Sequence, residues 1–164
     1  MGGGAEALER LGVLVGEWEV EADLPGAEAG PAARCVFSWE LDGRFLVQRT
    51  RIPVPGAPDS MAVIAVDPES GAYTYHYFDT RGVVRTYAMT FDGEEWLLLR
   101  ETADFSPLAF RQRFIGRVEG EVIRGAWEMA KSASAKSASA ESASASVESV
   151  DWERDFGLTF RRAR

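Results

Sequence analysis

The 164-residue sequence contains a single cysteine, Cys35, and a single histidine, His76. One cysteine excludes a disulfide within the chain and is typical of a protein from a reducing compartment. One cysteine and one histidine are also too few for a conventional zinc cluster. The sequence therefore predicts neither a disulfide framework nor a metal centre.

Several other signals are missing. No apolar run approaches the roughly 20 residues that a membrane helix needs, and the first residues lack the basic and apolar regions of a signal peptide. The sequence has no Gly-rich phosphate loop, no nucleophile elbow and no helical HExxH. We therefore expect a cytoplasmic protein, predict no catalytic residues, and favour a binding protein over an enzyme.

Positive charge is in deficit, because 18 basic residues face 26 acidic ones and the net charge is −8. Such a surface repels phosphate backbones and anionic lipids. We therefore predict no nucleic-acid partner and no membrane partner. The sequence leaves open whether the protein is a monomer or a homodimer.

What the sequence does contain is a series of short segments with alternating apolar and polar residues. In residues 152–160 an apolar residue recurs at nearly every second position, which is the period of a strand with one buried face. Similar segments follow one another from residue 18 to residue 128, separated by turn signals such as Asp42-Gly43. The pattern predicts about ten strands, preceded by one short helix over residues 5–14.

Sequential strands with short connections favour an all-β fold. We predict a closed antiparallel up-and-down β-barrel of about ten strands, with the short N-terminal helix capping one end. Closure removes the unpaired edges of an open sheet, and the last strand is expected to pair with the segment that begins at Trp18. A two-sheet sandwich is the alternative. The length fits one domain spanning residues 1–164.

One segment breaks the alternating pattern. Residues 131–146 read KSASAKSASAESASAS and lie between the last two predicted strands. They contain no aromatic or branched apolar residue, so they cannot build a packed core. We predict a solvated low-complexity loop, with a short alanine-supported helix as the alternative.

Strand parity places a few polar side chains on faces that are otherwise apolar. These side chains are Arg85, Gln112 and Arg154, with Gln48 as a fourth candidate. A guanidinium stays charged at ordinary pH, so an inward arginine needs a partner. That partner is a ligand, a protein carboxylate, or water at a barrel rim. The same rule assigns Leu97 and Leu99 to the inner face.

A barrel of this size can hold one small ligand. Arginines, a glutamine and aromatic rings suit a small apolar or amphipathic molecule with an anionic or carbonyl head. We therefore predict a small-molecule binding protein. The predicted polar contacts are Arg154, Arg85, Gln112 and Tyr87, and the predicted apolar walls are Trp39, Trp127 and Phe114.

His76 lies in a segment, residues 73–78, where both faces are partly apolar and parity does not fix its direction. A hydrogen-bonded strand histidine is the favoured interpretation. The alternative places His76 inside the barrel, as a ligand contact, a haem ligand or a general base. An enzyme acting on a small hydrophobic substrate in the same cavity would need His76 or a carboxylate there. A third class is a structural protein with a solid barrel.

Several motifs resemble calycin-type barrels. In residues 11–18 a short helix leads into the strand motif Gly16-Glu17-Trp18, which resembles the start of such barrels. Residues 75–83, 110–116, 125–128 and 152–156 resemble an uncharacterised family of bacterial calycin-like proteins. The resemblance covers nearly all of the chain except residues 131–146, and it implies a barrel.

Related barrels include nitrobindin-like haem proteins, lipocalins and fatty-acid-binding proteins. The nitrobindin-like proteins use a histidine near the C-terminus and a longer Gly-rich opening motif. This sequence has no histidine after His76, so the resemblance does not extend to that mode of haem binding.

Overall fold

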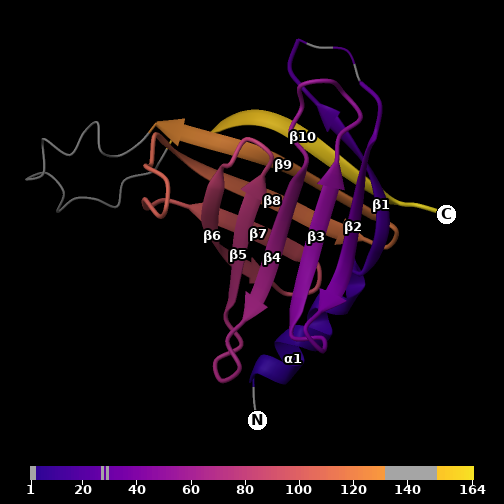
Figure 1. Ribbon diagram of the computed structural model, residues 1–164, viewed down its shortest axis with the longest axis vertical. Coiled ribbons are helices and arrows are strands. Elements are labelled where there is room, and N and C mark those ends of the chain that lie inside the picture. Colours follow the sequence, from indigo (N-terminus) through magenta and orange to yellow (C-terminus); the bar gives the residue numbers. More distant parts are fainter. Residues whose placement is uncertain (1–2, 27, 29, 132–150) are drawn as a thin grey trace, which may run out of the picture.

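The computed structural model describes residues 3–26, 28, 30–131 and 151–164. A short helix α1 (Gly3–Arg10) continues into a 3-10 turn η1 (Leu11–Leu14), which together match the helix predicted over residues 5–14. Ten strands follow (Figure 1). They are β1 (Gly16–Asp23), β2 (Ala33–Glu40), β3 (Phe45–Arg51), β4 (Ser60–Val66), β5 (Tyr73–Asp79), β6 (Val84–Phe91), β7 (Glu95–Arg100), β8 (Phe110–Glu119), β9 (Val122–Lys131) and β10 (Glu153–Arg162).

The strands form a closed barrel in which each strand pairs antiparallel with its neighbours in the sequence. The ring closes between the first and last strands, where Val20 faces Phe160 and Ala22 faces Leu158. The predicted all-β barrel of about ten strands is therefore confirmed, and the sandwich is excluded. Apart from Lys131, which ends β9, the predicted Ser/Ala-rich loop lies outside the described residues.

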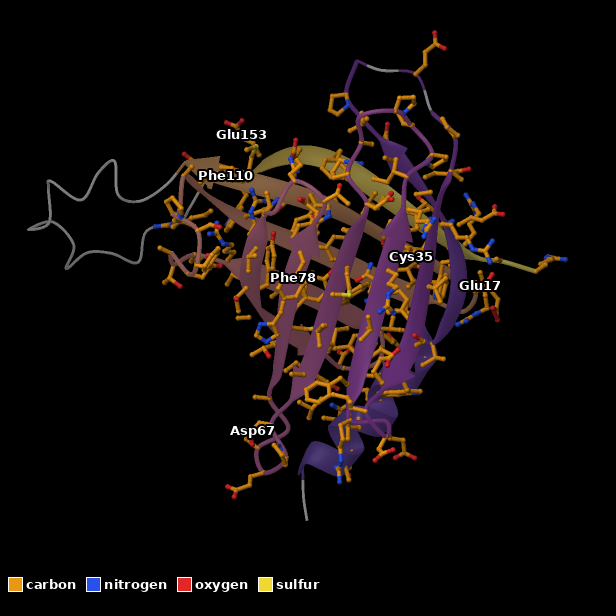
Figure 2. The ribbon with its side chains drawn as sticks, viewed as in Figure 1. Glu17, Cys35, Asp67, Phe78, Phe110 and Glu153 are labelled. Carbon is orange, nitrogen blue, oxygen red and sulfur yellow. The ribbon has the colours of Figure 1, made fainter. Side chains whose placement is uncertain are left out.

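The two ends of the barrel differ. α1 lies against the turn between β4 and β5, where a Cβ atom on Gly4 would come within 2.5 Å of the Pro68 carbonyl oxygen, and Arg10 donates a hydrogen bond of 3.1 Å to the Tyr73 hydroxyl. We call this the helix end. The connections after β1, β3, β5 and β7 form the opposite end, which we call the loop end. Figure 2 shows Asp67 at the helix end and Phe110 at the loop end.

Side chains fill the helix half of the barrel. Trp18, Leu46 and Trp96 are buried there, and Leu11 and Leu14 of η1 close the end. The indole N–H of Trp18 donates to the Leu14 carbonyl at 2.9 Å, which ties η1 to the first strand. Burial of aromatic and aliphatic side chains on this scale is the main source of the stability of the fold.

Arg162, near the C-terminus, joins the closing strand to the start of the barrel. Its guanidinium lies 4.2 Å from the centre of the Trp18 ring and donates to the carbonyls of Val15 and Val13 at 2.8 and 2.9 Å. Gly16 makes room for it, because its φ is +127° and a Cβ atom there would lie 2.8 Å from an Arg162 nitrogen. This contact explains why glycine precedes the Glu17-Trp18 pair.

Among the described residues, no helix is long and apolar enough to cross a membrane.

Candidate functional site

A β-bulge in β10 decides where Arg154 points. Arg154 faces Glu128 and Phe156 faces Trp127, so Asp155 has no partner on β9. The extra residue reverses the alternation of side chains along the strand. Phe160 and Leu158 therefore pack in the core as their parity predicted, but the residues before the bulge do not.

Arg154 is exposed on the outer face, where its guanidinium covers Gly157 and lies 3.5 Å from the Asp23 carboxylate. Trp152 also lies outside, with the Arg113 guanidinium 4.3 Å from the centre of its ring. Both residues were predicted to face inward, and that prediction is wrong. A surface ion pair, rather than a ligand, is the partner of Arg154.

His76 also lies on the outer face. Its neighbours Tyr75 and Tyr77 belong to or pack against the core, so alternation directs His76 outward. Its Nε2 atom lies 2.9 Å from the hydroxyl of Thr74, an exposed neighbour on the same face. The alternative that placed His76 inside the barrel is therefore wrong, and its roles there as a ligand contact, haem ligand or general base lose the placement on which they rested. His76 is a hydrogen-bonded strand histidine.

Five of the predicted site residues do come together inside the barrel. The Tyr87 hydroxyl donates to Gln112 Oε1 at 2.6 Å, and Arg85 donates to the same oxygen at 3.4 Å. The Trp127 ring lies 5.6 Å from that of Tyr87 and 5.3 Å from that of Phe114. Burial raises the pKa of Tyr87, so its hydroxyl stays a donor at neutral pH. Contact of these residues with a ligand stays a prediction.

Trp39 lies inside the barrel but apart from this cluster. It is half-buried against the core and faces Leu46 near the helix end. The predicted apolar wall is therefore divided: Trp127 and Phe114 adjoin Tyr87, whereas Trp39 belongs to the packing near η1.

A second polar group lies deeper in the barrel. The Tyr75 hydroxyl donates to Gln48 Oε1 at 2.8 Å, and Gln48 Nε2 lies 3.4 Å from the Cys35 sulfur as its donor. Burial raises the pKa of Cys35 to about 11. All three side chains are therefore neutral at physiological pH, and they form a buried, uncharged polar group inside the barrel.

The sequence did not reveal Arg100, a charged residue that is almost completely buried (4% exposed). Trp96 and Leu98 face inward on β7 at 2% and 1% exposure, so alternation directs Arg100 inward as well. The inward assignment of Leu97 and Leu99 is therefore wrong. Because residues 96–99 are all apolar, alternation could not be read there.

Asp104 neutralises Arg100. Two nitrogens of the guanidinium donate to its carboxylate at 2.9 and 3.0 Å, and the guanidinium also reaches the carbonyls of Ser106 and Pro107. These hydrogen bonds from Arg100 hold the pKa of Asp104 well below its usual range. The connection after β7 is thus fastened to the barrel by a buried ion pair.

A second carboxylate lies at the loop end. The Asp79 side chain is fully covered and accepts hydrogen bonds from the Tyr77 hydroxyl at 2.8 Å and from Arg81 at 2.6 Å. Burial opposes its ionisation, but the hydrogen bonds from Arg81 and Tyr77 outweigh burial and lower the pKa of Asp79 to about 2.

Arg85 differs from these paired groups. It is half-buried, its guanidinium carbon lies 5.8 Å from the centre of the Phe110 ring, and among the described residues no carboxylate lies within ion-pair distance of it. In the same part of the chain, no group of three or more His, Cys, Asp or Glu side chains could hold a metal ion. Within the described residues, the contacts of the Arg85 guanidinium are thus with Gln112 and the Phe110 ring.

These features define a closed ten-stranded antiparallel β-barrel with one continuous core, in whose interior Arg85 and Gln112 are polar. No family model and no curated protein sequence matches the chain. Among solved structures the chain is similar to Rv2717c from M. tuberculosis, with a TM-score of 0.58 and 15% sequence identity. The match covers 96% of this chain and 98% of that chain. At this identity the likeness shows the fold alone.

Proposed function

We propose that the barrel binds one small amphipathic molecule in the loop half of its interior, with an anionic or carbonyl head at Arg85. The observation that carries this proposal is the state of Arg85: its side chain faces inward, and the one side-chain hydrogen bond that it makes with the described residues, to Gln112, is long at 3.4 Å. A guanidinium that is partly removed from water and lacks a carboxylate attracts an anionic group strongly.

The surroundings of Arg85 suit the rest of such a molecule. Tyr87 shares the Gln112 oxygen with Arg85, and the rings of Trp127 and Phe114 continue from Tyr87. The Tyr75 ring, 5.7 Å from that of Tyr87, links this cluster to the neutral group around Gln48. Binding sites for small molecules commonly combine apolar walls with a few fixed polar groups. The helix half of the barrel is packed by its own side chains, which leaves the loop half for the ligand.

The sequence resemblance agrees with an interior ligand. The Gly16-Glu17-Trp18 motif resembles calycin-type barrels, which include lipocalins and fatty-acid-binding proteins. The outward position of His76 removes the reason to propose haem ligation or acid–base catalysis by that residue. The single buried cysteine suits the cytoplasmic location that we propose for this activity.

A pair of arginine variants tests the role of Arg85. The anionic probe 1-anilinonaphthalene-8-sulfonate (ANS) is titrated by fluorescence, and the uncharged analogue N-phenylnaphthylamine serves as the comparison probe. Arg85→Met is expected to weaken ANS binding about tenfold, since a hydrogen bond to a charged group contributes about 1.5–3 kcal/mol, and to leave the neutral probe within about twofold.

Arg34→Met is the matched control. It removes the same charge from an exposed ion pair with Glu17 on the outer face, so neither probe should respond to it. Equal weakening of both probes by Arg85→Met, or equal effects of the two variants, would contradict a head group at Arg85.

Native ligands are sought separately, by organic extraction of the purified protein and mass spectrometry. We expect one amphipathic compound in roughly molar proportion to the wild-type protein and depleted in Arg85→Met. A protein that carries no compound and binds neither probe would have a barrel filled by its own side chains, and the proposed function would fail.

A further inference from the structure

The ladder between β6 and β7 is the shortest in the barrel. It runs over four residue pairs, from Phe91↔Trp96 to Ala88↔Leu99, whereas every other ladder has five or more. β6 nevertheless continues to Val84 toward the loop end. Residues 84–87 are thus paired with β5 on one side and with no strand on the other.

Side chains of the connection between β7 and β8 replace the missing strand partner of residues 84–87. Asp104 accepts a hydrogen bond of 2.7 Å from the backbone N–H of Thr86, and the Ser106 hydroxyl donates to the Val84 carbonyl at 2.9 Å. Arg100 holds Asp104 in position. The wall is therefore closed here by a few side-chain contacts, which can open locally without disrupting the rest of the barrel.

A cleft of about 480 Å³ lies at the same seam. It is lined by residues of both faces of the wall: the outward-facing Thr74, Thr86 and Leu99, and the inward-facing Tyr87 and Arg100. Tyr87 is also hydrogen-bonded to Gln112 inside the barrel. Tyr87 therefore belongs both to the lining of the cleft and to the interior cluster.

We infer that the seam between β6 and β7 is a side entrance, through which an amphipathic ligand passes between the cleft and the barrel interior when the Arg100–Asp104 pair moves aside. The inference rests on the proposed function for its ligand. Phe105, 81% exposed on the same connection, offers an apolar surface at the entrance. Tyr87 and Arg100 form the inner side of the passage and lead to Arg85.

Hydrogen exchange tests the seam without any ligand. The Thr86 amide is expected to exchange much faster than that of Thr90, which lies in the paired part of β6. Asp104→Asn should speed exchange at Thr86 by about tenfold, because a charge-assisted contact that closes the seam is weakened. Asp59→Asn is the control, since Asp59 binds the Ile52 N–H in another connection of the same end. Equal protection of Thr86 and Thr90, unchanged in Asp104→Asn, would overturn the inference.

A reversible lock tests passage of a ligand. Thr86→Cys with Thr102→Cys places two cysteines in the lining of the cleft, one on β6 and one in the connection after β7. ANS association is followed by stopped-flow fluorescence in the oxidised and reduced forms. Oxidation should slow association at least about tenfold and leave the affinity within about twofold, as expected when only a gate is closed. Cys35 is fully buried and stays out of the exchange.

Asp59→Cys with Thr80→Cys is the matched control pair, because these residues already contact each other across a neighbouring part of the same end. Oxidation of this pair should leave the association rate unchanged. Equal rates for the oxidised and reduced forms of the 86–102 pair would show that ligand enters elsewhere. If the reduced protein binds no ANS, the proposed function fails, and the exchange experiment still decides whether the seam opens.

Discussion

At the scale of the residue, Leu41 is unfavourable in two respects, the exposure of its side chain and the conformation of its backbone. Its side chain is 73% exposed, and its φ of +51° lies in the left-handed region that a branched side chain disfavours. Asp42 and Gly43 follow with φ of +60° and +74°. The Asp-Gly pair suits this tight turn between β2 and β3, whereas Leu41 contributes strain without burial.

We predict that Leu41→Gly stabilises the protein by about 1 kcal/mol, because the left-handed conformation costs a residue with a Cβ atom about 1–2 kcal/mol and glycine removes most of that strain. Urea unfolding measures the difference. Leu24→Gly is the control, since Leu24 is also exposed but does not have a positive φ. A stability gain of the same size in both variants would contradict an origin in backbone strain.

Residue directions were the least predictable part of the site. The inward positions of Arg85, Tyr87 and Gln112 followed from regular alternation. Arg154 did not, because the extra residue Asp155 reverses parity and nothing in the local composition marks it as a bulge. Arg100 escaped notice for a different reason: an all-apolar run precedes it and offers no alternation to extend.

At the scale of the element, Arg162 joins β10, η1 and β1. It stacks on Trp18, donates to two carbonyls of the chain that enters the barrel, and pairs with Glu121 at 2.6 Å. We predict that Arg162→Ala lowers the free energy of unfolding by about 3 kcal/mol, since two hydrogen bonds from a charged group and a cation–π contact are lost together.

Arg162→Lys should recover less than half of that loss, because an ammonium cannot stack flat on an indole while reaching two carbonyls. Arg161→Ala, one position away on the exposed face, is expected to change stability by less than about 0.5 kcal/mol. Denaturant unfolding of the three variants checks the pattern. Full rescue by lysine would show that Arg162 stabilises the protein through its charge alone.

The connection between β5 and β6 gives a dependence on pH. The pKa of Asp79 is lowered from 3.8 to about 2, so folding favours its ionised form. Its contribution is complete above about pH 4 and is lost as the pH falls toward 2. We expect ionised Asp79 to add about 1–2 kcal/mol to the free energy of unfolding, because Arg81 is exposed and solvent screens part of the interaction.

Asp79→Asn should therefore be less stable than the wild type at pH 6, and the difference should shrink as the pH falls from 4 to 2. Thermal unfolding across this range measures it. Asp42→Asn, at the exposed turn, serves as the control for loss of one negative charge. A difference between Asp79→Asn and wild type that stays constant from pH 6 to pH 2 would show that the carboxylate is not the titrating group.

The elements themselves were largely predictable. Alternating segments separated by turn pairs such as Asp42-Gly43 define hairpins locally, and this turn does join β2 to β3. The short ladder between β6 and β7 was not predictable, because β6 and β7 each look regular and the missing pairing is supplied by Asp104 from a connection.

At the scale of the whole molecule, closure depends on one contact between the ends of the chain. β1 pairs on one side with β2 and on the other with β10. We predict that a chain ending at residue 151 fails to unfold cooperatively and associates, because β1 and β9 then expose unpaired edges. Addition of a peptide spanning residues 152–164 should restore a sharp transition, monitored by circular dichroism and gel filtration. A truncated chain that stays monomeric and cooperative would contradict this dependence.

The same closure has a consequence during synthesis on the ribosome. β1 is synthesised long before its second partner, because Trp18 pairs with Arg162 and Glu21 pairs with Thr159. Because chains elongate at about 5–20 residues per second, the first strand waits several seconds with one edge open. A message cut before the codons of β10 would release a chain whose β1 edge stays unpaired and can associate with other chains. The protein is thus most prone to aggregate while it is being synthesised, and that exposure ends when β10 has left the ribosome and paired with β1.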